Sequence, residues 1–173
     1  MTAPLKTPPL KTQPLNAQTA TPAWAKVLVP TIAGLAGLLA LAALQAGTGA
    51  ALFALPWVAA VGIIAVAPQA PFVQPRAMLI GQVSAGVMGL AAVAVLGPSI
   101  WTAAVAAGLA TAPMMLLKAP HPPATATAAL IGATGPSWWF LLDPILLASA
   151  ATVLVGWALG TVLPAHRYPA KWW

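Results

Sequence analysis

VLVPTIAGLAGLLALAALQAGTGAALFALPWVAAVGIIAVAPQAPFVQP, the stretch from Val27 to Pro75, contains 49 residues and no Asp, Glu, Lys, Arg or His. The hydrocarbon core of a bilayer needs ~20 helical residues per crossing. This stretch is therefore long enough for two membrane-spanning helices and the turn between them. Gln45-Ala46-Gly47-Thr48-Gly49 is the natural break, and we expect helices over residues 25–46 and 50–67.

The composition of the whole chain agrees with a lipid environment. Of its 173 residues, 61% are hydrophobic and 5% are charged, whereas a soluble domain carries about 25% charged residues. So few charges cannot cover a surface exposed to water. The sequence therefore predicts an all-α fold, a polytopic transmembrane helix bundle in the cell membrane with the lipid bilayer around it.

Proline and glycine positions divide the rest of the chain. The segment over residues 68–75 contains three prolines and cannot be a regular helix. A charge-free run over residues 77–117 follows, and Gly97-Pro98-Ser99 divides it. We expect further helices over residues 75–96, 99–117 and 139–163.

The segment after His121-Pro122-Pro123 decides the number of crossings. Ala124 to Thr134 is apolar, but with ~1.5 Å rise per residue it is short for a span. If it crosses, the bundle has about six membrane segments and all Lys and Arg residues lie on one side. If it re-enters, Arg167 and Lys171 lie on the side opposite the other cations. The positive-inside rule favours six segments with both termini cytoplasmic.

The remaining parts of the chain are assigned by composition. Residues 1–23 are rich in Pro and Thr without a continuous apolar stretch, which predicts a disordered tail. Residues 24–164 form the transmembrane domain, and residues 165–173 form a C-terminal tail. The net charge of +6 comes from cations scattered singly between apolar runs. We interpret these cations as topology determinants and expect no nucleic-acid binding.

Tryptophans and glycines add two further expectations. Seven of the eight tryptophans fall near expected helix ends or in the tail, as in an interfacial belt: Trp24, Trp57, Trp101, Trp138, Trp139, Trp172 and Trp173. Gly156 and Gly160 have the GxxxG spacing of close helix contacts. This spacing fits either a homo-oligomer interface or packing within one bundle.

Two breaks in the apolar pattern place a cationic or titratable residue at a helix start. Pro75 is expected to open one helix and Pro122 or Pro123 the short one, because proline suits the first helical turn. Arg76 and His121 then lie where the helix dipole disfavours a cation. Free backbone N–H groups and the dipole favour an anion at such a place, so we expect an anion site there.

The candidate substrate-binding residues lie at these two breaks and one or two turns beyond them: Gln74, Arg76, Gln82, His121, Thr125 and Thr127. Each also has a structural interpretation. Arg76 is then a snorkelling topology charge, and His121 is bonded to a nearby carbonyl. The two threonines are then back-bonded to their own helix, and Gln82 makes an interhelical hydrogen bond.

Asp143, which precedes Pro144, is the only acidic residue. It either starts the last helix, where a carboxylate suits the dipole, or it serves ion coupling or a proton relay. The chain has no cysteine, and its two histidines are far apart, so we expect no metal site. No Gly-x-Ser-x-Gly motif occurs, and we expect no catalytic residues, no cofactor and no enzyme activity.

His121-Pro122-Pro123, followed by Ala126-Thr127-Ala128, resembles the motif of the HPP family of small membrane proteins. The family is named for this tripeptide, which is usually followed by Gly-Gly-Ala-Thr-Ala. The second matching block resembles the family's Ser-Pro-x-x-Gln-Pro-Arg-Asn segment and its Gly-Gly-His continuation. That block consists of Pro71, Gln74, Pro75, Arg76, Gly81 and Gly89. The resemblance covers roughly residues 30–163.

This chain departs from the family pattern at several polar positions. Ala77 stands in place of Asn, Ile80 in place of Gly and Gln82 in place of His. Ala124-Thr125 replaces the usual Gly-Gly. The polar lining expected here is therefore thinner than that of the family.

The resemblance implies a membrane transport protein, since some plastid and cyanobacterial relatives are described as nitrite transporters. We therefore expect a permease or channel for a small inorganic anion, with nitrite as the leading candidate. Two alternatives stay open. One is a pathway for a neutral weak acid such as nitrous acid, and the other is a non-transporting membrane partner or assembly protein.

Overall fold

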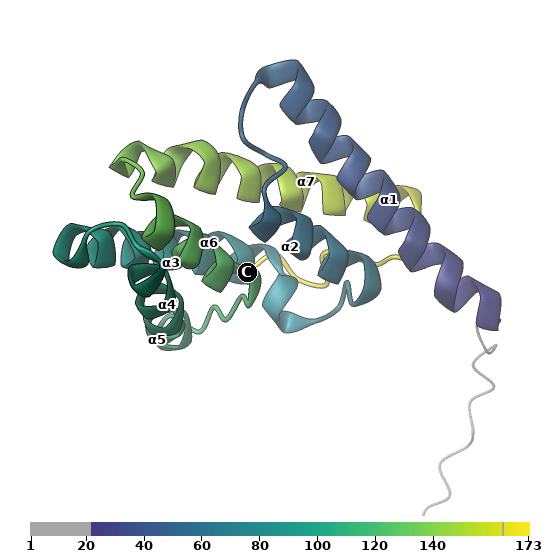
Figure 1. Ribbon diagram of the computed structural model, residues 1–173. Coiled ribbons are helices and arrows are strands. Elements are labelled where there is room, and N and C mark those ends of the chain that lie inside the picture. The colour runs from purple at the N-terminus through teal and green to yellow at the C-terminus, as the bar shows by residue number, and fades with distance from the viewer. Residues whose placement is uncertain (1–21, 164) are drawn as a thin grey trace, which may run out of the picture.

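The computed structural model describes residues 22–163 and 165–173, so nearly all of the expected N-terminal tail lies outside the described residues. The described residues form helices and connections without a strand, which confirms the all-α helix bundle (Figure 1). The elements in chain order are α1 (Ala23–Thr48), α2 (Leu55–Val66), the 3-10 turn η1 (Pro71–Val73), α3 (Pro75–Leu96), α4 (Ile100–Leu109), α5 (Thr111–Leu116), α6 (Pro123–Thr134), the 3-10 turn η2 (Trp138–Leu141), the π turn η3 (Leu142–Leu146) and α7 (Leu147–Val162).

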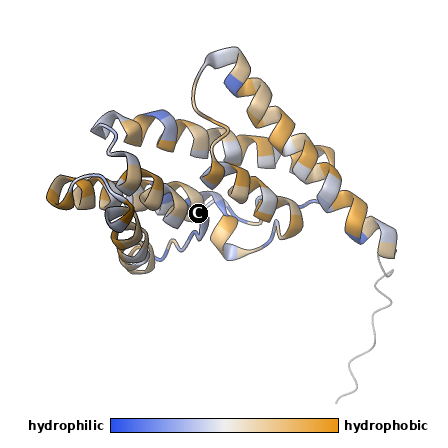
Figure 2. Cartoon of the chain, in the orientation of Figure 1, coloured by the Kyte–Doolittle hydropathy of each residue, from blue (hydrophilic) through white to orange (hydrophobic). Residues whose placement is uncertain are grey.

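Three helical segments are long and apolar enough to cross a membrane: α1, α3 and the segment from Trp138 to Val162. Two shorter apolar segments, α2 and Ile100–Leu116, accompany them. Hydrophobic residues occur along all of the long helices (Figure 2). Large apolar side chains are exposed on the outside of the bundle. The Leu116 side chain, for example, is 83% exposed. A surface of this kind suits lipid rather than water, and the chain is a multi-pass membrane protein.

The second helix begins later than predicted. Residues 50–54 do not extend the helix, and α2 starts at Leu55 with Pro56 in its first turn. Proline favours this position because its missing N–H needs no partner there. The Phe53 N–H instead donates to Gln45 Oε1 at 2.8 Å. The 12 residues of α2 therefore span only ~18 Å.

The helix predicted over residues 99–117 is interrupted after Leu109. Pro113 has no N–H to donate to the Leu109 carbonyl, and this missing bond explains the division into α4 and α5. Thr111 Oγ1 donates to the Gly108 carbonyl at 2.6 Å beside the break. The start predicted at Ser99 is confirmed, because the Ser99 side chain caps α4 by accepting the Thr102 N–H at 3.0 Å.

The last membrane segment is also interrupted. It opens with η2 and η3, and regular α-helix begins only at Leu147. Asp143 has the extended backbone angles φ −126° and ψ 111° within η3. Asp143 lies in the first turn of η3, so it is at the start of the last helical stretch as one of its two interpretations predicts, although that stretch does not begin as regular α-helix. Pro144, which follows it, has no N–H to continue a regular ladder.

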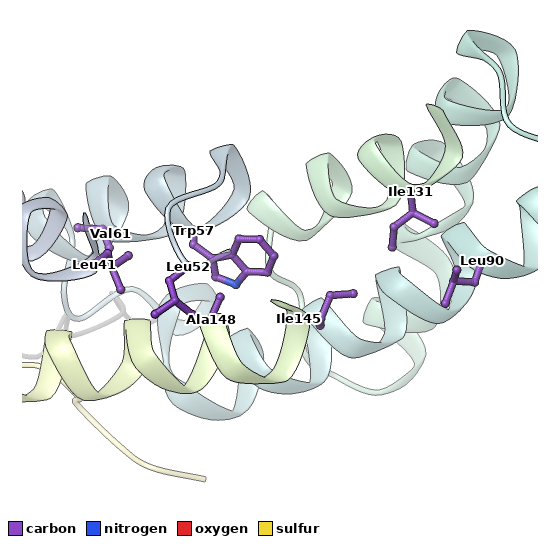
Figure 3. Packing of buried hydrophobic residues seen from close by; sticks show 8 residues of the cluster. All are labelled: Leu41, Leu52, Trp57, Val61, Leu90, Ile131, Ile145 and Ala148. Atoms are coloured by element: carbon purple, nitrogen blue, oxygen red, sulfur yellow. The ribbon is translucent and has the colours of Figure 1, made fainter. Parts of the chain in front are cut away.

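The main core cluster is elongated and lies between α7 and the helices that cover it (Figure 3). Trp57 lies at its middle, between Leu52 on one side and Ile145 on the other. The Trp57 side chain is fully buried, and its Nε1–H donates to Ser149 Oγ at 3.1 Å. The interfacial position expected for Trp57 is therefore wrong, since the indole packs in the core and has its polar atom paired.

Glycines allow α6 to pack closely against α3 and α4. A Cβ on Gly132 of α6 would lie 2.6 Å from Ala103 Cα of α4. A Cβ on Gly89 of α3 would lie 3.0 Å from Ile131 Cβ of α6. The short helix after the His-Pro-Pro motif is thus an integral part of the bundle.

The Gly156 and Gly160 face of α7 is covered by the chain's own C-terminal segment. A Cβ on Gly156 would lie 2.8 Å from Tyr168 Cε1, and Gly160 faces the Tyr168 carbonyl. Of the two interpretations of this GxxxG spacing, the structure supports packing within one chain. The segment at residues 165–173 runs back from the end of α7 toward the middle of the bundle (Figure 1).

Candidate functional site

A buried polar pair joins α3 and α6. Thr127 Oγ1 donates to Gln82 Oε1 at 2.5 Å, and both side chains are fully buried. The Gln82 Nε2 has no hydrogen-bond partner within the described residues. If the amide oxygen and nitrogen exchange positions, the oxygen is the atom left unpaired. Gln82 therefore makes the interhelical bond that its structural interpretation predicts. Its Nε2 is left without a partner among the described residues.

His121 packs against α3 at Gly81, the residue that precedes Gln82. A Cβ on Gly81 would lie 2.6 Å from His121 Cβ, so only glycine leaves room for the imidazole. His121 Nδ1 lies 2.7 Å from the Phe72 carbonyl oxygen. Because a carbonyl only accepts, Nδ1 carries the proton and Nε2 of the neutral ring is an acceptor. Nε2 has no partner in the described part of the chain.

The charge expected at the start of the short helix is absent at neutral pH. Burial lowers the pKa of His121 to about 4, so its imidazole is neutral at pH 7. The first N–H groups of the helix are also in use. Ala124 N–H donates to the His121 carbonyl at 2.9 Å, and Thr125 N–H donates to the Pro122 carbonyl at 3.1 Å. Thr125 Oγ1 donates to the same Pro122 carbonyl at 2.8 Å, as the back-bonding interpretation predicts. For Thr127 that interpretation is wrong, because its Oγ1 donates to Gln82 instead.

Gln74 has all of its amide hydrogen-bonding capacity in use. Its Nε2 donates to the carbonyls of Pro68 at 3.0 Å and Ala70 at 2.9 Å. Its Oε1 accepts from the N–H groups of Ala170 at 2.8 Å and Lys171 at 3.3 Å. The side chain is buried and holds the connection before α3 against the C-terminal segment. These four bonds leave no polar atom of Gln74 for a substrate.

Arg76 joins the start of α3 to the end of α5. Its Nη1 donates to the Lys118 carbonyl at 2.6 Å, and its Nη2 donates to the Leu117 carbonyl at 2.8 Å. Carbonyls at a helix C-terminus favour a cation. The Arg76 Cζ also lies 5.6 Å from the centre of the Trp173 ring, within reach of a cation–π interaction.

A cavity of about 110 Å³ lies beside Arg76. Three cationic residues line it, Arg76, Lys118 and Lys171, together with Trp172 and Trp173. No acidic side chain lines it. This arrangement brings together cations from three separate parts of the sequence and can hold an anion.

A second cavity, of about 190 Å³, lies on the other side of Pro120, which lines both. His121 and Thr125 line this cavity together with Met114 and Met115. The six predicted substrate residues therefore occur in three neighbouring groups. These are Gln74 with Arg76, His121 with Thr125, and Gln82 with Thr127.

Asp143 lines neither of these two cavities. It lies in η3, in the connection between α6 and α7. Among residues 22–163 and 165–173, no group of three or more His, Cys, Asp or Glu side chains is close enough to hold a metal ion. The coupling role of Asp143 stays a prediction.

Sequence reasoning missed the C-terminal segment as part of this region. Tyr168 is buried, and its hydroxyl donates to the Val73 carbonyl at 3.0 Å. Gln69 Nε2 donates to the Arg167 carbonyl. The one sign in the sequence that this segment packs against the bundle was that Tyr168 is the only tyrosine in the chain. These contacts bring Lys171 to the cavity beside Arg76.

Comparison with known proteins gives two matches. A family model described as HPP, transmembrane region, matches residues 19–169. A transmembrane protein of Dictyostelium discoideum is 30% identical over 115 residues, which are 62% of this chain and 37% of that protein. The chain thus spans little more than a third of the length of this curated relative. No solved structure matches the chain.

Proposed function

This chain belongs to the HPP transmembrane family, and we propose that it transports a small inorganic anion across the cell membrane, with nitrite as the leading candidate. The observation that carries the proposal is a pair of fully buried polar atoms, Gln82 Nε2 and His121 Nε2, which have no partner among the described residues. Leaving such an atom unpaired costs about 1–3 kcal/mol. A polar substrate that passes between α3 and α6 would remove this cost.

The two free atoms have different chemistry. The Gln82 amide donates, so it suits an oxygen of nitrite or of a similar oxyanion. His121 Nε2 accepts while the ring is neutral, so it needs a proton. A bare anion in an apolar interior is very costly unless it is paired. We therefore propose that the anion is bound together with a proton on His121 Nε2, with Thr127 holding the Gln82 amide in place.

A second candidate function is passage of the neutral weak acid itself. The observation that favours it is the burial of His121, which lowers the pKa of its imidazole to about 4 and so favours the neutral ring. The hydroxyl of a protonated acid would donate to His121 Nε2, and its other oxygen would accept from Gln82. In this case no net charge crosses the membrane.

Nitrite uptake into proteoliposomes tests the site. We expect Gln82→Leu to reduce uptake about 10- to 100-fold, because a hydrogen bond to a charged group contributes about 1.5–3 kcal/mol. Ser84→Ala is the matched control. Ser84 also lies on α3 and is buried, but its Oγ donates to the Gly81 carbonyl of its own helix at 3.0 Å. Wild-type uptake in Gln82→Leu would reject the site, provided that both variants elute as folded protein.

The same vesicles separate the candidate functions. If the proton stays on His121 while the anion crosses, uptake responds to an imposed membrane potential, and this response supports the anion. Uptake that follows only the concentration of the protonated acid supports the neutral species. If wild-type vesicles take up no anion and a partner protein copurifies, the transport proposal is wrong. A role as a membrane partner or assembly protein is then favoured.

A further inference from the structure

An apolar groove of about 530 Å³ runs along the outer side of α3. Leu79, Val83 and Val87 of α3 form one wall, and Pro113 and Leu117 form the other. Val87 and Leu117 are exposed, at 42% and 48%. The groove therefore opens toward the hydrocarbon that surrounds the bundle.

The groove ends at the cationic cavity. Arg76 lies on the same face of α3 as Leu79, Val83 and Val87, because positions three to four residues apart share a helix face. The Arg76 guanidinium donates to the carbonyls of Leu117 and Lys118. It thus joins the two walls of the groove at the place where the cavity with Lys118 and Lys171 begins.

We propose that the cavity and the groove together bind one anionic phospholipid. The phosphate lies among Arg76, Lys118 and Lys171, and one acyl chain lies along α3. This inference does not depend on the transport proposal, because it rests on the outer surface of α3 rather than on its contact with α6.

The dimensions of the groove suit one leaflet. From Arg76 to Met88, at the far end of the groove, twelve residues of α3 span ~18 Å at ~1.5 Å per residue. One leaflet contributes half of a hydrocarbon core of ~30 Å. An acyl chain whose headgroup is held at Arg76 therefore reaches the end of the groove near the middle of the bilayer.

Charge and aromatic residues favour a headgroup over a free anion. The cavity has three cations and no acidic side chain, and clusters of Lys and Arg next to membrane segments attract anionic lipids. Trp172 and Trp173 beside it are exposed, at 53% and 74%, and tryptophan is enriched at the level of the headgroups. A free anion would fill the cavity and leave the groove unused, whereas a phospholipid uses both.

Native mass spectrometry of the full chain, titrated with phosphatidylglycerol or phosphatidylcholine, tests the headgroup site. We expect tighter binding of phosphatidylglycerol. The double variant Lys118→Gln/Lys171→Gln changes two exposed side chains and should weaken that binding about 25-fold, at ~1 kcal/mol per cation. Lys26→Gln is the matched control, an exposed cation in the first turn of α1 that does not line the cavity.

A second pair of variants tests the groove. Val87→Trp fills it and should weaken phosphatidylglycerol binding about tenfold. Val95→Trp, on the same helix but outside the groove, should leave binding unchanged. Equal binding of the two lipids, or unchanged binding in the lysine variant, would overturn the proposal. If inorganic phosphate displaces the lipid and Val87→Trp has no effect, the cavity is a free-anion site and the phospholipid assignment is wrong.

Discussion

Gly81 is the residue on which the placement of His121 depends. A Cβ at this position would lie 2.6 Å from His121 Cβ and 3.0 Å from the Ala119 carbonyl oxygen. Neither atom is the end of a flexible side chain, so a methyl group must push the connection before α6 away from α3. The imidazole would then move away from α3.

We expect Gly81→Ala to destabilise the protein by about 1–3 kcal/mol, the usual cost of overpacking. Gly62→Ala is the matched control, because a Cβ on this glycine of α2 meets nothing within 4 Å. In a helix interior the control change should be neutral or stabilising by up to about 1 kcal/mol. Thermal unfolding in one detergent compares the two variants, and equal midpoints would contradict the close contact at Gly81.

The residues of the candidate site could be named from the sequence, but their pairing could not. Proline positions and the rare polar residues of an apolar chain marked Gln74, Arg76, His121 and Gln82. The local pattern could not show that Gln74 is bonded to a segment 96 residues away. Nor could it show that His121 is buried and neutral, because its burial is produced by contacts with α3 and with Phe72.

At the scale of elements, the C-terminal segment acts as a packing element of the bundle. The Tyr168 ring lies against Gly156 of α7, and its hydroxyl is bonded to the Val73 carbonyl before α3. It thereby holds the end of α7 and the start of α3 together, and it positions Lys171 beside Arg76.

We expect Tyr168→Ala to lower the free energy of unfolding by about 3 kcal/mol or more, the usual cost of removing a buried aromatic side chain. Tyr168→Phe keeps the ring, loses only the hydroxyl bond and should cost about 1 kcal/mol. Thermal unfolding together with limited proteolysis of the C-terminal segment measures both. If Tyr168→Ala is as stable as the wild type, the segment does not pack as described.

Helix positions were predictable to the extent that charge-free runs and prolines define them. Pro75 and Gly97 bound α3 as predicted. The errors arose at prolines inside apolar runs. Pro56 sets the start of α2 and Pro113 divides α4 from α5, yet hydropathy alone treats both as parts of continuous spans. The interruption at Asp143 likewise depends on backbone angles that hydropathy does not record.

For the molecule as a whole, three cations, Arg76, Lys118 and Lys171, gather at one cavity. If this cavity lies at one membrane surface, the chain between Lys118 and Lys171 leaves that surface and returns to it. The segment from Trp138 to Val162 is long enough for one crossing. One further passage is needed, and α6 is the helix that lies between Lys118 and Trp138 in the described part of the chain. This favours the six-segment arrangement, although the 12 residues of α6 span only ~18 Å.

Labelling of introduced cysteines tests this topology. The chain has no cysteine of its own, so no native thiol is labelled. Lys118→Cys, Ser137→Cys and Lys171→Cys each introduce a thiol at an exposed position. A membrane-impermeant maleimide added to sealed vesicles of either orientation should label positions 118 and 171 from one side and position 137 from the other. Labelling of positions 118 and 137 from the same side would show that α6 re-enters. Lys171 would then reach the cavity only if its segment passed back through the bundle, and the shared cavity would no longer define one side of the membrane.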